Sequence, residues 1–305
     1  MKCLISAHDA GGAEVVSAWV RRHPENQYSY VLGGPAENIF RRKIAALENK
    51  PAAEMEAAVK RSDFVLTATS ASSELETSAL AHALRNGIPS ATFLDYWWGF
   101  KQRFERGGIL HLPEEIWVGD AYAFSMAQTV FPELRIVLKD NPYLLDVAEE
   151  RKRFPSRPFP AEGTTILYLS QPINENQTHE NGRTTLVNDY EAVKLFLRIL
   201  ATRYPPTRGP LHVRIRPHPA ESPGKYSLLA AEFREIPVTI SSYQSLVEDC
   251  ANADWAVGVY TMALVVALSM GMKAFYCLPD GARPFSSVIP YSEIGDFKHF
   301  MTTLQ

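Results

Sequence analysis

A histidine between two prolines follows a predicted strand in the second half of the chain. Apolar and polar residues alternate through Leu211–Arg216, which predicts a strand with one apolar face. Pro217 cannot donate to a sheet ladder and should end that strand, so His218 and Pro219 form a stiff turn at its carboxyl end. Ligands of open α/β sheets bind beyond such ends. The imidazole, with Arg216 behind it, suits a phosphate; the alternative is a solvated basic face followed by a proline-rich turn.

Three more segments of this half place polar side chains where a strand is expected to end. The strands are predicted over 164–170, 238–240 and 255–259, and the polar residues after them are Gln171, then Ser241, Ser242 and Gln244, then Tyr260 and Thr261. An apolar helix is predicted from Thr261 onward, and its free N–H groups would favour a phosphate. The Thr261 hydroxyl suits that phosphate or a cap on its own helix, and the two roles are compatible.

A glycine-rich turn follows the first predicted strand, residues 2–7. Asp9, Gly11 and Gly12 precede a predicted helix over 13–22, which is how a Rossmann-like unit begins. The GxGxxG signature of dinucleotide sites is missing, so NAD is not expected. The glycines either let a ligand approach the backbone or serve a tight turn only. Asp9 is the first candidate for a catalytic base; its alternative role is to accept backbone N–H bonds within the turn.

Aromatic residues and a carboxylate follow another predicted strand, residues 90–94. Asp95 and Trp97 would line a sugar pocket, or Trp97 would pack in the core. Glu175 is a further candidate acid, because it lies in a polar stretch, 173–186, that is too long for a simple connection. Asp95 and Glu175 rank after Asp9 as the base.

Strands alternate with helices through both halves of the chain, and a proline-rich stretch separates the halves. The pattern predicts the α/β class with two Rossmann-like domains facing a cleft, the architecture called GT-B. The predicted domains are 1–150, a linker at 151–163, a second domain at 164–290, and a tail at 291–305 that packs back. Function does not follow from this fold alone, because non-hydrolysing sugar epimerases share it.

Composition limits the classes of function. The 305 residues, 46% hydrophobic and 21% charged, suit about two soluble domains, and the net charge of −3 argues against a nucleic-acid partner. Cys3, Cys250 and Cys277 lie far apart, which favours a reducing cytoplasm and predicts no metal site. No signal peptide or membrane span is expected, although Arg151-Lys152-Arg153 leaves peripheral membrane contact open.

The order His-Pro, serine-rich strand end, then Gly258-x-x-Thr261 before an apolar helix resembles bacterial sialyltransferases of GT-B architecture. The resemblance covers roughly the C-terminal third, and the segment from Leu169 to Pro172 with Glu175 is similar to the Gln-Pro element of the lipooligosaccharide enzymes. It implies that His218 contacts the donor phosphate and assists the departure of CMP. Tyr260-Thr261 stands where those enzymes have a Ser-Ser pair on the same phosphate, and Gln244 where they often have an acidic ribose ligand.

The sequence therefore predicts an inverting, metal-independent glycosyltransferase of bacterial surface polysaccharide synthesis, with His218 and Asp9 as catalytic residues. Its donor would be a CMP-linked nonulosonic acid, its acceptor a glycan or other hydroxyl, and no cofactor beyond the donor is expected. The second domain would bind the donor and the first the acceptor. The alternatives are a hexosyl or polyol-phosphate transferase of the same fold using UDP, GDP or CDP donors, and a non-catalytic subunit of this shape.

Overall fold

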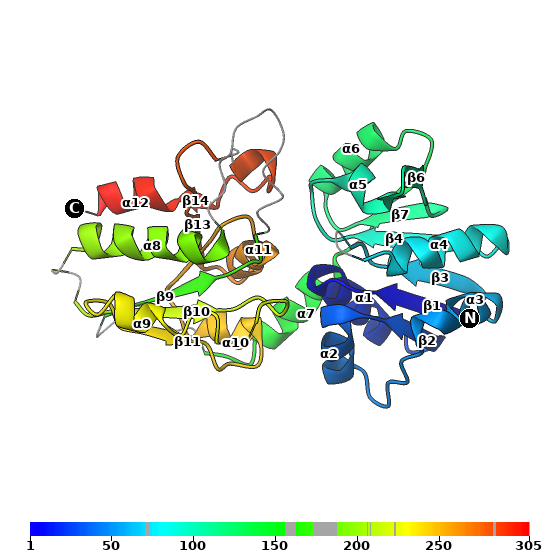
Figure 1. The fold of residues 1–305 in the computed structure, drawn as a ribbon, viewed down its shortest axis with the longest axis horizontal. Helices are drawn as coiled ribbons and strands as arrows, with labels where there is room; N and C mark the ends of the chain where they lie inside the picture. Colours follow the sequence, from blue (N-terminus) through cyan, green and yellow to red (C-terminus); the bar gives the residue numbers. More distant parts are fainter. Residues whose placement is uncertain are drawn as a thin grey trace. The chain divides into compact units, whose positions relative to one another are not determined.

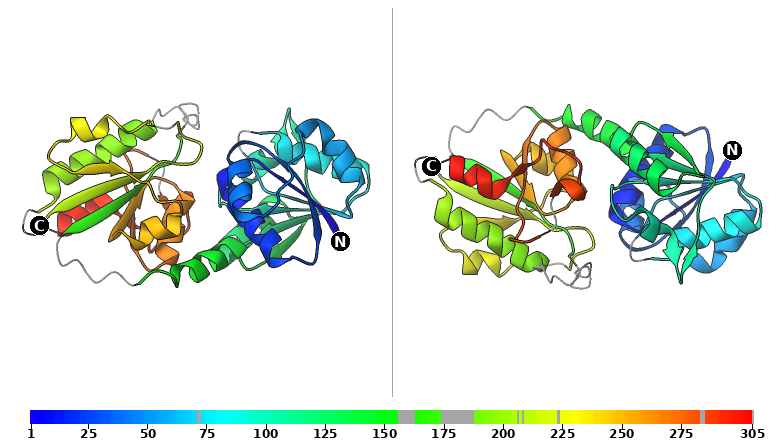
Figure 2. Two further views of the ribbon diagram at one scale, coloured as in Figure 1. Left: turned by 90° about the horizontal axis from the view of Figure 1, so that it is seen from below. Right: turned by 90° about the horizontal axis from the view of Figure 1, so that it is seen from above.

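The chain forms two compact units, each built on one parallel sheet. The computed structural model describes residues 1–70, 73–155, 163–173, 188–205, 207, 209–222, 224–282 and 285–304. Unit 1 is Met1–Asp146 and unit 2 is Val147–Gln305. In each unit a six-stranded sheet carries helices on both faces (Figures 1 and 2). The predicted α/β class with two parallel-sheet domains is confirmed.

Unit 1 has the strand order β2-β1-β3-β4-β7-β8, with every neighbouring pair parallel. Its strands are β1 (Lys2–Ala7), β2 (Gln27–Leu32), β3 (Phe64–Thr67), β4 (Ser90–Leu94), β7 (Glu115–Val118) and β8 (Arg135–Leu138). A small antiparallel hairpin joins β5 (Glu105–Arg106) to β6 (Ile109–Leu110). The helical segments are α1 (Ala10–Arg22), α2 (Gly34–Lys43), η1 (Ala52–Glu54), α3 (Met55–Lys60), α4 (Leu75–Arg85), α5 (Phe100–Phe104), α6 (Ala121–Val130) and α7 (Pro142–Arg151), which continues into unit 2.

The strands of unit 1 are apolar almost throughout because both faces of the sheet are covered. Ile5 of β1 faces α1 and α2, where it joins a buried cluster with Trp19 and Phe40. The next residue back, Leu4, belongs to the cluster on the opposite face, with Val59 of α3. This alternation explains why such short strands hold two helical layers.

Unit 2 has the strand order β11-β10-β9-β12-β13-β14, again parallel throughout. Its strands are β9 (Thr164–Leu169), β10 (Leu211–Arg216), β11 (Val238–Ile240), β12 (Trp255–Gly258), β13 (Lys273–Tyr276) and β14 (Gly295–Asp296). The helical segments are α8 (Asp189–Arg203), α9 (Leu229–Glu232), α10 (Leu246–Ala251), α11 (Met262–Ser269), η4 (Phe285–Ser287) and α12 (Phe297–Thr303).

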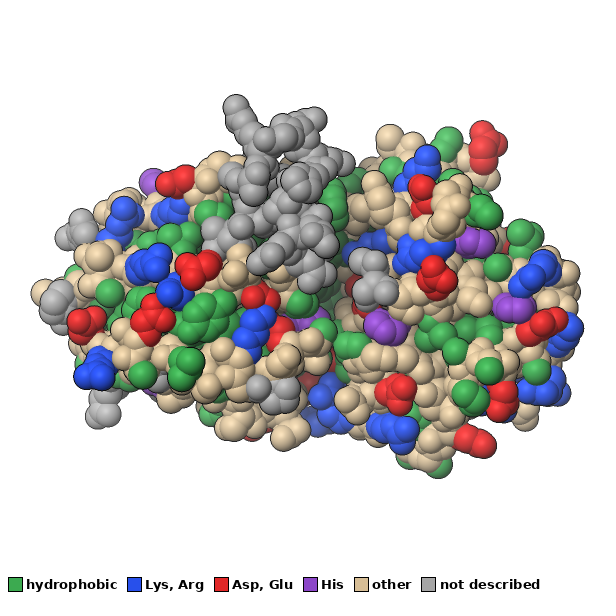
Figure 3. Space-filling model, viewed as in Figure 1, with side chains coloured by type: hydrophobic (Ala, Val, Ile, Leu, Met, Phe, Trp, Pro, Cys, Tyr) green, Lys and Arg blue, Asp and Glu red, His purple; other side chains and the backbone are tan. Residues whose placement is uncertain are grey.

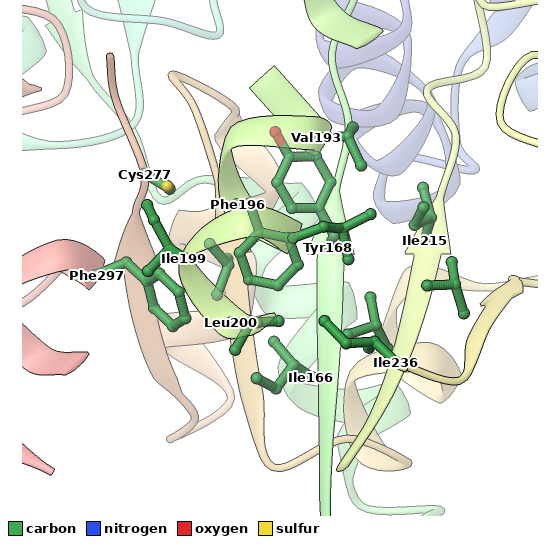
Figure 4. Close-up of a cluster of buried hydrophobic side chains, with 14 of the residues drawn as sticks. Ile166, Tyr168, Val193, Phe196, Ile199, Leu200, Ile215, Ile236, Cys277 and Phe297 are labelled. Atoms are coloured by element: carbon green, nitrogen blue, oxygen red, sulfur yellow. The ribbon is translucent and has the colours of Figure 1, made fainter. Parts of the chain in front are cut away.

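Aliphatic and aromatic side chains together fill the core of unit 2 on the face covered by α8 and α12 (Figure 4). Tyr168 of β9 packs on Phe196 of α8 with ring centroids 5.0 Å apart, and Phe297 of α12 lies 5.2 Å from Phe196. The chain's last helix is thus part of this core.

Helix α7 carries the chain from unit 1 into unit 2. Helix α7 runs on to Arg151, and the division between the units falls within it, after Asp146. Asp146 is tied to α1 by Arg22, with Nη2 2.8 Å from Oδ1. The predicted linker at 151–163 stays a prediction, since 156–162 lie outside the described residues.

On the face drawn in Figure 3, acidic and basic side chains are interspersed. None of the helices in the described part of the chain is long and apolar enough to cross a bilayer.

Candidate functional site

The predicted site segments of unit 2 meet at one edge of the sheet. The chain proceeds from β9 to β10 and β11 on one side, and from β12 to β13 on the other, so the strand order reverses between β9 and β12. All these strands are parallel, and Gln171, His218, Ser241 and Thr261 follow the ends of β9, β10, β11 and β12 in that order. This edge is the topological switch point, where open α/β sheets bind ligands.

Backbone hydrogen bonds orient the His218 ring. The Ala220 N–H donates to Nδ1 of His218 over 3.1 Å. A ring nitrogen that accepts a hydrogen bond carries no proton, so the neutral ring carries its proton on Nε2. The N–H of His218 in turn donates to Oε2 of Glu221 over 2.8 Å. The residue is partly exposed rather than packed in the core. The ring therefore presents an N–H donor at the carboxyl end of β10.

Glu221 anchors this turn to β9. Its side chain is 1% exposed and its Oε1 accepts hydrogen bonds from Ser170 at 3.0 Å, Tyr226 at 2.6 Å and Lys225 at 3.0 Å. Burial and the hydrogen bond to Glu221 raise the pKa of Tyr226 well above its ordinary value, so the phenol stays a donor. Sequence reasoning missed Glu221. The available signal was its spacing, because an acid three residues after a turn start can bond back to that residue's N–H.

The arginine behind His218 is held by a buried acid. Asp249 is fully buried, and its Oδ2 lies 3.1 Å from Nη1 of Arg216 and 2.5 Å from the Ser241 hydroxyl that donates to it. Nη1 of Arg216 also donates to the Tyr243 carbonyl over 3.1 Å. Arg214 closes the network with Nε 2.6 Å from Oδ1 of Asp249. Arg216 and Ser241 thus fix the loop between β11 and α10, and their predicted ligand roles stay predictions.

Helix α11 begins at the switch point with a capped end. Thr261 is 7% exposed, and its Oγ1 accepts the Ala263 N–H over 3.2 Å, as expected for the cap alternative. A Cβ on Gly258 would lie 2.9 Å from the Leu169 carbonyl oxygen, so only glycine lets β12 and α11 come this close to β9. Tyr260 stacks on Phe285 with centroids 6.1 Å apart and planes 14° apart.

Other predicted residues of this edge differ in exposure. Oε1 of Gln171 is buried and has no hydrogen-bond partner among the described residues, whereas three predicted residues are exposed: Pro219, Ser242 and Gln244. The Gln244 carbonyl faces Nη2 of Arg216 at 3.4 Å. Glu175 lies outside the described residues.

A second group of polar side chains gathers at the carboxyl edge of unit 1. Nδ1 of His8 lies 2.8 Å from Oδ1 of Asp9, and the Ser70 hydroxyl donates to the same oxygen over 2.9 Å. Asp9 precedes α1 but makes no side-chain capping bond to it. An ionised carboxylate only accepts, so Nδ1 of His8 is the donor and Nε2 of the neutral ring is unprotonated. The pair has the chemistry of a general base.

A buried acid lies behind this pair. Glu76, in the first turn of α4, is 3% exposed, and its Oε1 accepts the His8 N–H over 2.7 Å. Burial, with a smaller contribution from the charge of Asp9, raises the pKa of Glu76 to about 7. Its Oε2 is buried and has no hydrogen-bond partner in the described part of the chain. Sequence reasoning missed Glu76.

Asp95 and the paired glycines form one packed unit with α1. Thr69 donates to Oδ1 of Asp95 over 3.0 Å and Arg103 lies 3.4 Å from it, but burial dominates and raises the pKa of Asp95. A Cβ on Gly11 would collide with Oδ2 of Asp95, and one on Gly12 would lie 2.6 Å from Cβ of Ala68. The glycines thus serve close packing, and their ligand role stays a prediction.

Trp97 is a core residue. It is 2% exposed and its Nε1 donates to Oδ2 of Asp120 over 2.8 Å. Trp97 thus packs in the core and does not line a sugar pocket, because a buried ring offers no face for stacking on a sugar. The neighbouring Trp98 is 40% exposed. Within the described ranges, no group of three or more His, Cys, Asp or Glu side chains is arranged to hold a metal ion.

Solved structures similar in fold to this chain include two UDP-GlcNAc 2-epimerases and MurG. The UDP-GlcNAc 2-epimerase of Neisseria meningitidis bound to UDP-GlcNAc matches with a TM-score of 0.62 and 9% identity, covering 99% of this chain and 90% of that one. The enzyme of Methanocaldococcus jannaschii with UDP-GlcNAc and UDP matches with 0.60 and 12%, covering 100% and 91%. MurG of Acinetobacter baumannii matches with 0.52 and 9%, covering 92% and 80%.

The chain therefore has a GT-B-type fold. Its sequence matches no protein-family model and no curated protein. At identities of 9% to 12% the structural likeness concerns the fold, and the activity has to be argued from the residues.

Proposed function

We propose that this chain is a GT-B-type glycosyltransferase that binds a nucleotide-linked sugar through unit 2, with UDP as the leading nucleotide. Structures of the same fold contain UDP-GlcNAc and UDP, which supports a UDP-sugar over the CMP-linked donor expected from sequence. Two residues also favour a donor other than a CMP-linked sugar, because Gln244 replaces the acidic ribose ligand of the CMP-sugar enzymes and Tyr260 replaces one of their serines.

The oriented His218 ring carries this proposal. Departure of a nucleotide concentrates negative charge on its leaving phosphate, and an enzyme without a metal needs fixed N–H or O–H donors there. Nε2–H of His218 is such a donor, since Nδ1 is occupied by the Ala220 N–H. The start of α11 adds backbone N–H groups and a favourable dipole at the same sheet edge. The buried oxygen of Gln171 offers an acceptor for a ligand N–H or O–H.

Unit 1 would supply the base. The acceptor hydroxyl loses its proton to the His8–Asp9 pair, and its oxygen forms the new bond to the anomeric carbon. The bond between that carbon and the phosphate oxygen breaks, with its electron pair passing to the leaving nucleotide. The reaction then needs one base and one stabilised leaving group, as in general acid–base catalysis.

A thermal-shift panel with UDP, GDP, CDP and CMP tests the donor class. Binding at a hundred times Kd stabilises a protein by about 2.7 kcal/mol, which corresponds to several degrees in Tm. We expect UDP to give the largest shift in the wild type. A larger shift with CMP would restore the sialyl donor, and no shift with any nucleotide at millimolar concentration would favour a non-catalytic subunit.

A sugar epimerase is the second candidate. Three carboxyl groups gather at the carboxyl edge of unit 1, from Asp9, Glu76 and Asp95, and two of them have raised pKa values. Groups of this kind can exchange protons at a sugar carbon. Incubation with UDP-GlcNAc alone separates the two functions. An epimerase gives a nucleotide sugar of unchanged mass and altered stereochemistry, whereas a transferase releases UDP only with an acceptor or water.

A further inference from the structure

The side chain of Glu76 reaches from α4 to the strand end that carries the catalytic pair proposed above. Its Oε1 accepts the backbone N–H of His8, and the ring of His8 lies against Asp9, so the Glu76 side chain is joined to the His8–Asp9 pair through the backbone of His8. Glu76 is 3% exposed, and its second oxygen is buried with no hydrogen-bond partner among the residues described. A carboxylate whose only function was to hold a backbone N–H would be costly here, because one oxygen is desolvated without compensation.

The charged groups around Glu76 are few, which makes its electrostatic role definite. Asp9 opposes its ionisation, and the His8 ring favours it only when that ring is protonated. Helix α3, which packs on α4, carries Glu56 and Lys60, which pair with each other at 2.6 Å and act on the far end of α4, at His82. Asp9 is thus the main charge with which Glu76 interacts.

We propose that Glu76 is a positioning residue of the transfer reaction, which sets the basicity of the His8–Asp9 pair by gaining or losing one proton. This proposal rests on the proposed function. Protonated Glu76 is neutral and leaves the pair a weaker base. Ionised Glu76 adds a negative charge beside Asp9, so the pair binds the acceptor's proton more tightly. The proton that titrates on Glu76 exchanges with solvent and is not consumed in transfer.

A direct test is the titration of the Glu76 carboxyl by 13C NMR in the whole chain. Its resonance is identified by its absence in Glu76→Gln. We expect a midpoint of about 7 in the wild type. Coupling is reciprocal, so removing the charge in Asp9→Asn should lower that midpoint by about half a unit or more. Asp63→Asn, at the opposite edge of the sheet, should leave it unchanged.

A kinetic test uses the pH profile of transfer. In the wild type, turnover should rise about three- to tenfold through the ionisation of Glu76, as expected for an interaction of about one pKa unit. Glu76→Gln keeps an acceptor oxygen for His8 and should lose this inflection. Glu74→Gln, at an exposed residue two positions away, should retain it.

Different results would refute the role of Glu76 and the proposed function. A Glu76 midpoint near the ordinary 4.5 would overturn the proposal, even if Asp9→Asn did not fold. So would a midpoint indifferent to Asp9→Asn, or equal pH profiles for Glu76→Gln and wild type. Absence of turnover with every nucleotide sugar would refute the transferase while leaving the NMR result to decide the coupling of Glu76 to Asp9.

Discussion

At the scale of single residues, both candidate centres depend on buried acids that contact no ligand in our account. Glu221 fixes the turn of His218, Asp249 holds Arg216, and Glu76 holds the backbone of His8. The partners come from distant parts of the chain: 56 residues separate Ser170 from Tyr226, and 68 separate His8 from Glu76. Local sequence patterns carry no information on such pairs. The candidate site residues could therefore be picked from the sequence, whereas of the acids that support them only Glu221, three residues after His218, left a local signal.

Glu221→Gln tests the support of His218. The amide keeps one acceptor oxygen but presents N–H groups to the donors Tyr226 and Lys225. We expect a loss of about 1–3 kcal/mol in the free energy of unfolding, and weaker nucleotide binding. Urea unfolding measures the first. The control is Glu232→Gln, whose 41% exposed side chain pairs with Lys194 and should cost less than about 1 kcal/mol. Equal stabilities for the two variants would contradict the role of Glu221.

At the scale of elements, the sequence predicted most strands and the larger helices. Apolar runs ended by glycine, proline or polar residues mark the buried strands, and this signal is local. Short elements such as α3 and the hairpin of β5 and β6 were missed because they contain too few residues to show a periodic pattern of hydrophobic side chains. Helix α7 was not predicted at all, since the predicted linker begins only at its last residue, Arg151. For the glycines after β1 the sequence left a ligand approach and a tight turn open, and the structure shows protein atoms close to where a Cβ would lie.

Gly12→Ala tests the packing of α1 on β3. The added methyl would lie 2.6 Å from Cβ of Ala68, which cannot rotate away. Overpacking costs about 1–3 kcal/mol and exceeds the gain in helix propensity of about 1 kcal/mol or less. Gly11→Ala is the matched control, because the atom it meets ends the movable side chain of Asp95. We expect Gly12→Ala to unfold at lower urea concentration than Gly11→Ala; the reverse order would show that the α1–β3 contact is not limiting.

At the scale of the whole molecule, Glu76 should make stability depend on pH. Its pKa is raised from 4.5 to about 7, so the folded state holds its proton more tightly than the unfolded state. This contribution is complete below about pH 4.5 and is lost as pH rises to about 7, a loss of about 3 kcal/mol. Glu76→Gln should not show this loss, so its stability relative to the wild type should increase as the pH rises over that range.

Urea unfolding at pH 5 and pH 8 measures the effect. Four tryptophans lie in unit 1, at positions 19, 97, 98 and 117, so fluorescence reports mainly on the unit that contains Glu76. A constant stability difference between Glu76→Gln and wild type at both pH values would contradict a raised pKa.

A calorimetric titration of UDP into wild type, His218→Ala and His212→Ala tests directly whether the His218 ring binds the nucleotide. His218 follows the end of β10, whereas His212 lies within that strand and bonds Thr239 at 3.1 Å, away from the switch point. A hydrogen bond to a charged group contributes about 1.5–3 kcal/mol, so His218→Ala should weaken binding about 10- to 100-fold while His212→Ala stays close to wild type. Equal affinity for UDP in wild type and His218→Ala would contradict a phosphate-binding role for the His218 ring.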